Sequence, residues 1–212
     1  MDLLDGMKQP TELERLVDAI IFATHKHQGQ VRKDGNRSPY ITHPMAVATA
    51  IAEIGRVADT LVLKAAILHD TIEDTDTTEE EIRQSFGEEV LQVVLEVTDD
   101  KSLEKMERKR LQVIHAPTLS YSARIIKLAD KITNCQDILQ TPPQDWTLER
   151  RRNYIQWCAD VIFQIRGTNA ALEDTFDQII SEAEEKLDFQ VQPFDTIDQR
   201  PWGVNPDTLA KD

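Results

Sequence analysis

The chain of 212 residues carries 24 lysines and arginines against 38 aspartates and glutamates, a formal net charge of −14 at pH 7. This length predicts one domain with a substantial core, and the acidic charge argues against nucleic acids or anionic membranes as partners. Two cysteines, Cys135 and Cys158, are too few for a disulfide scaffold, and because we see no membrane span and no secretion signal we expect a cytosolic protein.

Helical periodicity begins close to the N-terminus. Thr11 and Glu14 have the spacing of a capping box, which predicts a first helix running to about Lys26. Its period directs five apolar side chains toward the core, namely Leu13, Leu16, Val17, Ile20 and Ile21. Residues 28–40 then break the period with two glycines, and we expect a loop or a short hairpin there.

The next two expected helices carry the polar residues of interest. The second starts at His43 and Pro44, with His43 at the N-cap and Pro44 at the first helical position. A central helix follows over residues 59–74. Its helical spacing predicts a core-facing stripe formed by Leu61, Ala65, Leu68 and Ile72.

The remaining chain continues the helical pattern. We expect helices over residues 77–86, 88–97, 102–116, 120–139, 147–166 and 169–187. There is no sustained strand pattern and no internal repeat, so the predicted fold class is all-α, a single bundle-like domain over residues 1–188. Residues 189–212 have three prolines and no helical period, which predicts a loosely ordered tail with Phe194 and Trp202 as candidates to dock on the body.

The polar side chains of the central helix indicate a metal site. The adjacent His69 and Asp70 offer one imidazole nitrogen and one carboxylate oxygen to a single divalent ion. Glu73 and Asp74 follow one helical turn later, where their carboxylates reach a water beside that ion. The alternative is an acidic helix end with one histidine at the edge of the core.

Two residues on other helices extend this candidate set. His43 is a candidate third ligand and Asp130 a candidate fourth. Asp130 is flanked by apolar core positions, and a buried carboxylate must be paired, hydrogen-bonded or bound to a metal because burying it free is costly. A salt bridge from Asp130 to Lys127 or Lys131 is the alternative.

Four segments of the chain carry a family resemblance, namely Gln28–Lys33, Tyr40–Pro44, Leu68–Thr75 and Lys127–Asn134. In this order they resemble the HD-domain hydrolase of RelA/SpoT-type alarmone enzymes, and in particular its small stand-alone branch, the metazoan SpoT homologues. The resemblance extends from about residue 13 to residue 187 and leaves no room for the nucleotide-synthesising domain of the bifunctional members. It implies a single HD-domain helical bundle.

The resemblance also implies an activity and a metal. Such enzymes hydrolyse guanosine tetra- and pentaphosphate, (p)ppGpp, at the 3′ position to GDP or GTP plus pyrophosphate, usually with Mn²⁺. Matched position by position, the implied metal ligands are His43, His69, Asp70 and Asp130. Two imidazoles and two carboxylates suit a divalent ion, but ligand type alone does not select Mn²⁺ over Zn²⁺ or Fe²⁺.

Catalytic and substrate-binding residues follow from the same matches. Glu73 and Asp74 match the family's acidic pair, with Glu73 orienting or deprotonating the attacking water, and Asn134 matches a residue that holds water or substrate near the metal. The implied substrate contacts are Arg32, Lys33, Lys105, Asn134, Arg150 and Tyr154. For each of the basic residues an ordinary solvated surface charge is the alternative, and it is the favoured interpretation of Lys105 and of Lys101.

Three functions stay open on the sequence. The first is hydrolysis of (p)ppGpp, and the second is removal of a phosphate from another nucleotide, such as the 2′-phosphate of NADPH. The third is a catalytically silent nucleotide-binding module, which the intact Glu73–Asp74 pair disfavours because binding alone needs no water-activating carboxylate. The sequence leaves the oligomeric state open.

Overall fold

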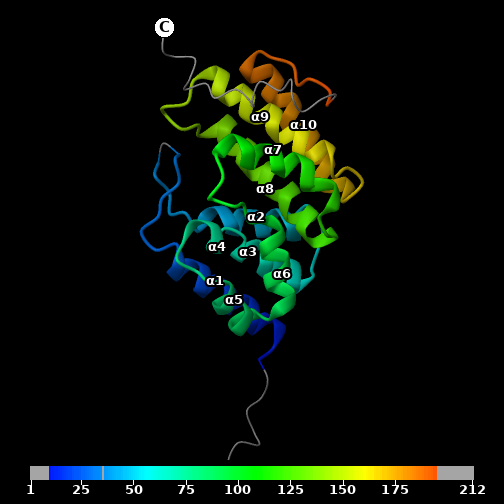
Figure 1. Ribbon diagram of the computed structural model, residues 1–212. Coiled ribbons are helices and arrows are strands. Elements are labelled where there is room, and N and C mark those ends of the chain that lie inside the picture. The colour runs from blue at the N-terminus through cyan, green and yellow to red at the C-terminus, as the bar shows by residue number, and fades with distance from the viewer. Residues whose placement is uncertain (1–9, 35, 195–212) are drawn as a thin grey trace, which may run out of the picture.

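The computed structural model describes residues 10–34 and 36–194, and these residues form a bundle of helices (Figure 1). The all-α prediction is confirmed. In chain order the elements are α1 (Glu12–Lys26), α2 (Thr42–Glu53), α3 (Thr60–Leu68), α4 (Thr71–Asp74), α5 (Glu79–Phe86), α6 (Glu88–Val97), α7 (Lys105–His115), the 3₁₀ turn η1 (Ala116–Thr118), α8 (Tyr121–Gln140), α9 (Leu148–Phe163) and α10 (Ala170–Leu187).

Helices α3 and α8 hold the bundle together. α3 packs against α1, α2 and α6, and α8 packs against α2, α9 and α10 as well as against α3. In Figure 1 the blue and teal helices α1–α6 form the lower part of the molecule, and α7, α9 and α10 form the upper part. The three helices α2, α3 and α8 are in mutual contact, so residues far apart in the sequence meet where the two parts join.

Local sequence signals set the helix ends. The capping box at Thr11 is present, with its hydroxyl accepting the Glu14 N–H, and a second capping box joins Thr78 and Glu81 at the start of α5. Gly87 separates α5 from α6 with φ of 92°, a backbone conformation that residues with a side chain rarely adopt. The chain therefore turns sharply there and returns α6 against α3.

An apolar stripe on α8 forms part of the core. Ala123, Ile126, Ala129 and Ile132 are all fully buried. Burying a branched side chain such as isoleucine contributes about 1.5–3 kcal/mol to stability, so this stripe holds α8 firmly between its neighbours. The polar residues on the adjacent face of α8 are thereby fixed in position.

The buried face of α1 differs from the prediction. Leu13, Val17 and Ile21 are 69%, 45% and 49% exposed, whereas Ala19 and Ala23 are fully buried. The small alanine side chains let α1 approach α3 closely. With the alanines facing the core, the larger apolar residues on the other side of α1 face water. Leu16 and Ile20 pack against the core as predicted, whereas the inward orientation predicted for Leu13, Val17 and Ile21 is wrong.

The expected central helix is interrupted at His69 and Asp70, where the structure has a turn between α3 and α4. The His69 ring nitrogen Nδ1 lies 2.7 Å from the Ala66 carbonyl oxygen, and the Thr71 hydroxyl donates to the Leu68 carbonyl. These side chains take carbonyls near the helix end, which competes with continuation of the regular helix. The predicted ligand pair therefore lies in a turn between two helices and not on the surface of one continuous helix.

The start of α2 also differs from the prediction. Ile41 is the N-cap and Thr42 is the first helical residue, so His43 and Pro44 lie inside the first turn and are buried. A tight turn precedes the helix, with the Thr42 N–H donating to the Pro39 carbonyl, and this turn extends the helix by one residue at its start. His43 therefore points from a packed helix face rather than off a helix end.

The two remaining segments have little regular structure. Between α1 and α2, an antiparallel bridge joins Val31 to Pro39, in agreement with the expected loop or short hairpin. After α10, Gln192 is hydrogen-bonded to Gln156 of α9, and the Phe194 ring stacks on Phe163 with 5.8 Å between the centroids. The predicted docking of Trp202 lies outside the described residues, and the division at residue 188 stays a prediction.

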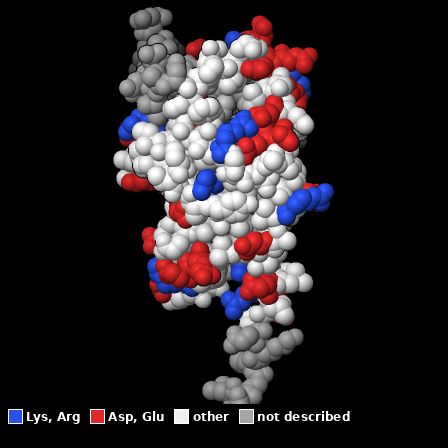
Figure 2. Space-filling view, turned by 90° about the vertical axis from the view of Figure 1, so that its right-hand side faces the viewer, with Lys and Arg blue, Asp and Glu red and all other residues white. Residues whose placement is uncertain are grey.

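The charges on the surface and the length of the helices give two further observations. On the face drawn in Figure 2, acidic and basic side chains are interspersed with large uncharged areas, and the described residues form no continuous basic stripe there. Within residues 10–34 and 36–194, no helix combines the length and apolar character needed to cross a bilayer.

Candidate metal and substrate site

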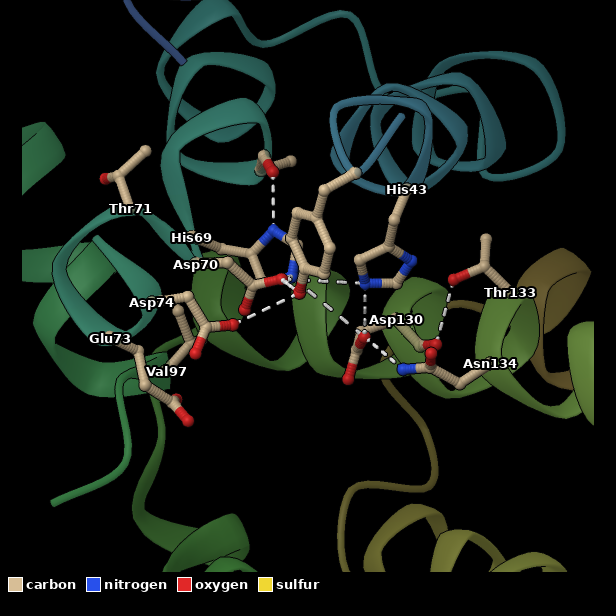
Figure 3. A network of polar contacts seen from close by, with 12 residues as sticks. His43, His69, Asp70, Thr71, Glu73, Asp74, Val97, Asp130, Thr133 and Asn134 are labelled. Atoms are coloured by element: carbon tan, nitrogen blue, oxygen red, sulfur yellow. Dashed lines mark hydrogen bonds and ion pairs between the residues drawn. The ribbon is translucent and has the colours of Figure 1, made fainter. Parts of the chain in front are cut away.

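Four side chains converge where α2, α3 and α8 meet, as Figure 3 shows for His43, His69, Asp70 and Asp130. His43 Nε2 lies 3.2 Å from Asp130 Oδ1 and 3.8 Å from Asp70 Oδ2. His69 Nε2 lies 3.2 Å from Asp70 Oδ2 and 4.0 Å from Asp130 Oδ1. His43, His69 and Asp130 are buried and offer ligand atoms that all lie within 4.8 Å of one another, so they can hold one metal ion.

The state of His69 fits a divalent cation. Its Nδ1 lies 2.7 Å from the Ala66 carbonyl, the geometry of an N–H donor, so in the neutral ring Nε2 is the nitrogen that carries the lone pair. This Nε2 is buried without a hydrogen-bond partner, yet it faces the Asp70 carboxylate. Two electron-rich atoms so close together need a positive charge between them, which either a proton or a metal ion can supply.

The electrostatics of the cluster agree with this assignment. Burial alone would lower the pKa of His69, but the Asp70 and Asp130 carboxylates outweigh it and raise that pKa to about 9. Burial alone would raise the pKa of both aspartates, but the neighbouring cationic groups hold both values below the usual range. Both carboxylates are therefore ionised at neutral pH, and the centre favours a cation, either a proton or a metal.

Asp130 is further held by its own helix. The Lys131 amine lies 2.9 Å from Asp130 Oδ2, and the Asn134 amide donates to Asp130 Oδ1 at 2.6 Å. The salt bridge to Lys131, which was the alternative to a metal site, therefore exists. It occupies one carboxylate oxygen of Asp130 and leaves the other facing both histidines. Lys127 instead donates to the Val97 carbonyl at 2.8 Å.

Tyr40 connects the loop before α2 to the acidic residues. Its hydroxyl donates to Asp70 Oδ2 at 2.6 Å and lies 3.2 Å from Asp74 Oδ2. Burial, together with the two carboxylates, raises the pKa of Tyr40 far above its usual value, so it stays a hydrogen-bond donor. The His27 ring packs against Tyr40 with 4.8 Å between the centroids.

Glu73 lies beside the metal cluster, toward α6 and α7. Its Oε2 accepts the Asp99 N–H at 3.1 Å, and its Oε1 lies 3.5 Å from an Arg108 guanidinium nitrogen. Burial, together with the negative charge of Asp99, raises the pKa of Glu73 above its usual value. A carboxylate with a raised pKa is better suited to accept a proton near neutral pH than an exposed glutamate is.

Asp74 has a more exposed position than Glu73. Lys101 forms an ion pair with Asp74, and its amine also lies 3.8 Å from Glu73. Lys101 is therefore more than a solvated surface charge, because this half-exposed residue is paired with the acidic residues of the site. Both carboxylates line the same cavity as the metal ligands.

A cavity of about 500 Å³ opens over this cluster. All the residues proposed from the sequence as metal ligands, catalytic groups or substrate contacts line it: Arg32, Lys33, His43, His69, Asp70, Glu73, Asp74, Lys105, Asp130, Asn134, Arg150 and Tyr154. One wall is acidic, with Asp70 from the turn after α3 and Glu73 and Asp74 from α4. A second wall, which we call the basic wall, carries basic and aromatic residues from α7, α9 and the loop of residues 28–40.

The basic wall is ordered by contacts within the protein. Arg32 forms an ion pair with Asp137 of α8, which fixes the loop of residues 28–40 against the cavity. The Arg150 guanidinium lies 4.5 Å from the centroid of the Trp146 ring, and the Tyr154 ring packs on the same tryptophan at 5.3 Å. These contacts pre-organise an arginine and an aromatic ring for an anionic, planar ligand.

The chain is similar in sequence to known proteins. The model of the HD domain family matches residues 19–156. The chain belongs to the HD domain family. Among curated proteins, it is 49% identical to the guanosine-3′,5′-bis(diphosphate) 3′-pyrophosphohydrolase MESH1 of Xenopus tropicalis over 164 residues, which cover 77% of this chain and 92% of that protein. It is 44% identical to human MESH1 over 172 residues, covering 81% and 96%.

A solved structure has the same architecture as this HD domain. It belongs to a metazoan ortholog of SpoT described as hydrolysing ppGpp and playing a role in starvation responses. The two chains superpose with a TM-score of 0.79 at 43% identity, over 82% of this chain and 97% of that one. The family resemblance read from the sequence motifs is therefore confirmed.

Several residues of this HD domain's cavity were missed by the sequence reasoning. Tyr40 lies within a recognised motif, three residues before His43, but no role was assigned to it. Lys109 lies four residues after Lys105 on the same face of α7, and that spacing was the available signal. Asp99 and Arg108 reach Glu73 only through the packing of α6 and α7, which no local pattern indicates.

Proposed function

We propose that this HD domain is a metal-dependent guanosine-3′,5′-bis(diphosphate) 3′-pyrophosphohydrolase, which converts (p)ppGpp to GDP or GTP plus pyrophosphate. The observation that carries the proposal is the cavity itself, in which a His43–His69–Asp130 cluster faces a wall of basic and aromatic residues. Relatives that match along most of their length are named for this activity. The activity belongs to alarmone degradation in the stringent response.

The metal would be held by His43, His69, Asp70 and Asp130. We propose Mn²⁺ as the ion, since the mixed nitrogen and oxygen donors accept it, although the same donors also accept other divalent ions. When bound, such an ion lowers the pKa of a coordinated water and neutralises charge on the attacked phosphate. The cytosolic location expected from the sequence stays a prediction.

The side chains around the cluster have separate roles in this proposal. Glu73 accepts a proton from the attacking water, and its raised pKa suits that task. Tyr40 holds Asp70 through its 2.6 Å hydrogen bond, and Asn134 holds Asp130. Because these second contacts fix the carboxylates, the reacting groups need little rearrangement when substrate arrives.

We assign substrate binding to the basic wall of the cavity. Arg32, Lys33, Lys105 and Arg150 supply the positive charge that a polyanionic nucleotide requires in a protein of net charge −14. Tyr154 adds a ring beside Arg150. Lys105 lines the cavity, which favours the substrate-contact interpretation over a solvated surface charge.

A second candidate substrate is NADPH, which also presents a phosphate on a nucleotide ribose and would use the same basic wall. The test is steady-state hydrolysis by protein that has been stripped with chelator and reloaded with Mn²⁺, with each substrate assayed separately. The proposal requires a higher kcat/KM for guanosine tetraphosphate and loss of turnover in the stripped protein. A higher kcat/KM for NADPH would make the alternative correct, and binding without turnover would favour the silent module.

The pH profile tests the role of Glu73. Only its deprotonated form accepts a proton, so kcat/KM at saturating Mn²⁺ should fall as the pH drops through the raised pKa of Glu73, at a pH above its usual 4.5. Asp99→Asn removes a negative charge that raises this pKa, so the acid limb should move to lower pH. An unmoved limb in Asp99→Asn would assign the profile to another group.

Arg150 is expected to act on binding. A hydrogen bond between charged groups contributes about 1.5–3 kcal/mol, so Arg150→Ala should raise KM for guanosine tetraphosphate about 10- to 100-fold. The value of kcat should change little if the contact is equally strong in the ground and transition states. Initial-rate measurements separate the two constants, and an unchanged KM would return Arg150 to the class of solvated surface charges.

A further inference from the structure

Lys109 is a cavity-lining lysine to which no role has been assigned. It lies on α7 one turn after Lys105, and its amine faces two aromatic rings of α9. The distance from Nζ to the ring centroid is 5.4 Å for Tyr154 and 4.8 Å for Trp157. Removal from water lowers the pKa of Lys109 to about 8.

Among the described residues, two other lysines pair with carboxylates that line the cavity, and Lys109 has no such partner. Lys131 is paired with Asp130, and Lys101 is paired with Asp74. Among the residues that the structure describes, the Lys109 amine forms no such ion pair, and its charged neighbours Lys105, Lys131 and Arg150 are all cations that lower its pKa further.

Such a position is unfavourable for the empty protein. A cation withdrawn from water destabilises the fold unless it is paired, and the two cation–π contacts offset only part of that loss. The unsatisfied positive charge faces the cavity that also holds the acidic wall and the candidate metal ligands. A ligand that brings negative charge to the basic wall would complete the missing pair.

We propose that Lys109 binds a phosphate group of the substrate and is a specificity-determining residue of the cavity. Its charge lowers the stability of the free protein and is compensated when a polyphosphate enters. The identity of the full substrate rests on the function proposed above. The phosphate-binding role itself needs only the position and the missing partner of Lys109.

Lys109→Met provides the test, because methionine keeps the length and apolar stem of lysine and removes its charge. We expect KM for guanosine tetraphosphate to rise about tenfold or more, as for other charged hydrogen bonds to phosphate, with a much smaller change in kcat. We also expect a melting temperature equal to or above that of the wild type, since an unpaired charge has been removed. A structural role alone predicts the opposite pair of results, a lower melting temperature and an unchanged KM.

Two further variants sharpen the result. Lys109→Arg keeps the positive charge and should recover part of the lost affinity. Lys186→Met removes an exposed lysine of α10 that is paired with Glu182, and it should leave KM unchanged. A rise in KM for Lys186→Met equal to that for Lys109→Met would show a general charge effect and would overturn the proposal.

Binding of inorganic pyrophosphate to the Mn²⁺-loaded protein, measured by calorimetry, separates this proposal from the proposed function. If the wild type does not hydrolyse guanosine tetraphosphate but Lys109→Met still weakens pyrophosphate binding about tenfold, the proposed function fails and the role of Lys109 stands. If KM and pyrophosphate affinity are both unchanged in Lys109→Met, the phosphate-binding role is wrong. Where the wild type shows no turnover, unchanged pyrophosphate affinity alone has the same consequence.

Discussion

Replacing Glu73 by glutamine is expected to lower kcat about a hundredfold or more while leaving the bound metal in place. A positioned acid–base group contributes about 10²- to 10⁴-fold to the rate, and glutamine keeps the shape of glutamate but cannot accept a proton. Glu73 is not among the residues of the metal cluster, so metal content should not change. The measurements are kcat and the metal-to-protein ratio of the purified variant.

The matched control for this prediction is Glu89→Gln, which alters an exposed glutamate of α6 outside the cavity. It should have the kcat of the wild type. Full activity of Glu73→Gln would remove Glu73 from the chemistry and leave Asp74 as the remaining acidic candidate. Loss of metal from Glu73→Gln would instead make Glu73 a part of the metal site.

Replacing His69 by alanine is expected to remove both the metal and the activity. His69 directs Nε2 at the cluster because Nδ1 is held by the Ala66 carbonyl. Since loss of a group that merely orients a ligand already weakens metal binding about 10- to 100-fold, loss of the ligand itself should exceed that. Metal content is measured after dialysis, and activity is measured with added Mn²⁺.

Thermal unfolding distinguishes loss of metal from loss of fold. A metal that binds only the folded state raises the melting temperature, so added Mn²⁺ should stabilise the wild type and His25→Ala, which alters an exposed histidine of α1. His69→Ala should fold and show no such increase. A His69→Ala protein that is stabilised by Mn²⁺ as strongly as the wild type would contradict the assignment of His69 as a ligand.

Much of the helical framework was predictable because helix signals are local. The capping boxes at Thr11 and Thr78 and the stripe on α8 depend on residues within one or two turns of one another. The inward face of α1 was not predictable in this way, because it depends on how closely α3 approaches Ala19 and Ala23. Hydrophobicity favoured the larger side chains, whereas close packing favoured the smaller ones.

The candidate site shows the same division between local and long-range information. His69, Asp70, Glu73 and Asp74 were found because they are neighbours in the sequence, whereas Asp130 was convincing only beside a known family pattern. The break between α3 and α4 was missed, since it depends on side chains that bind backbone carbonyls at one turn.

Contacts between helices account for the other omissions. Nothing in the sequence near Glu73 indicates that the Asp99 N–H and Arg108 would reach it. Tyr40 is hydrogen-bonded to Asp70, which lies 30 residues later in the chain. That Lys109 has no acidic partner within residues 10–34 and 36–194 is likewise a property of the assembled cavity, because a sequence does not show which charges stay unpaired.

The most direct test of the central claim is the identity and isotopic composition of the products. Mn²⁺-loaded protein is incubated with guanosine tetraphosphate in ¹⁸O-labelled water. The products are separated by chromatography, and their masses are measured by mass spectrometry. Attack of water on the phosphorus attached to the 3′ oxygen predicts GDP without label and pyrophosphate with one ¹⁸O atom. Release of orthophosphate, or the absence of any product from protein with metal bound, would contradict the assignment of this HD domain as a 3′-pyrophosphohydrolase.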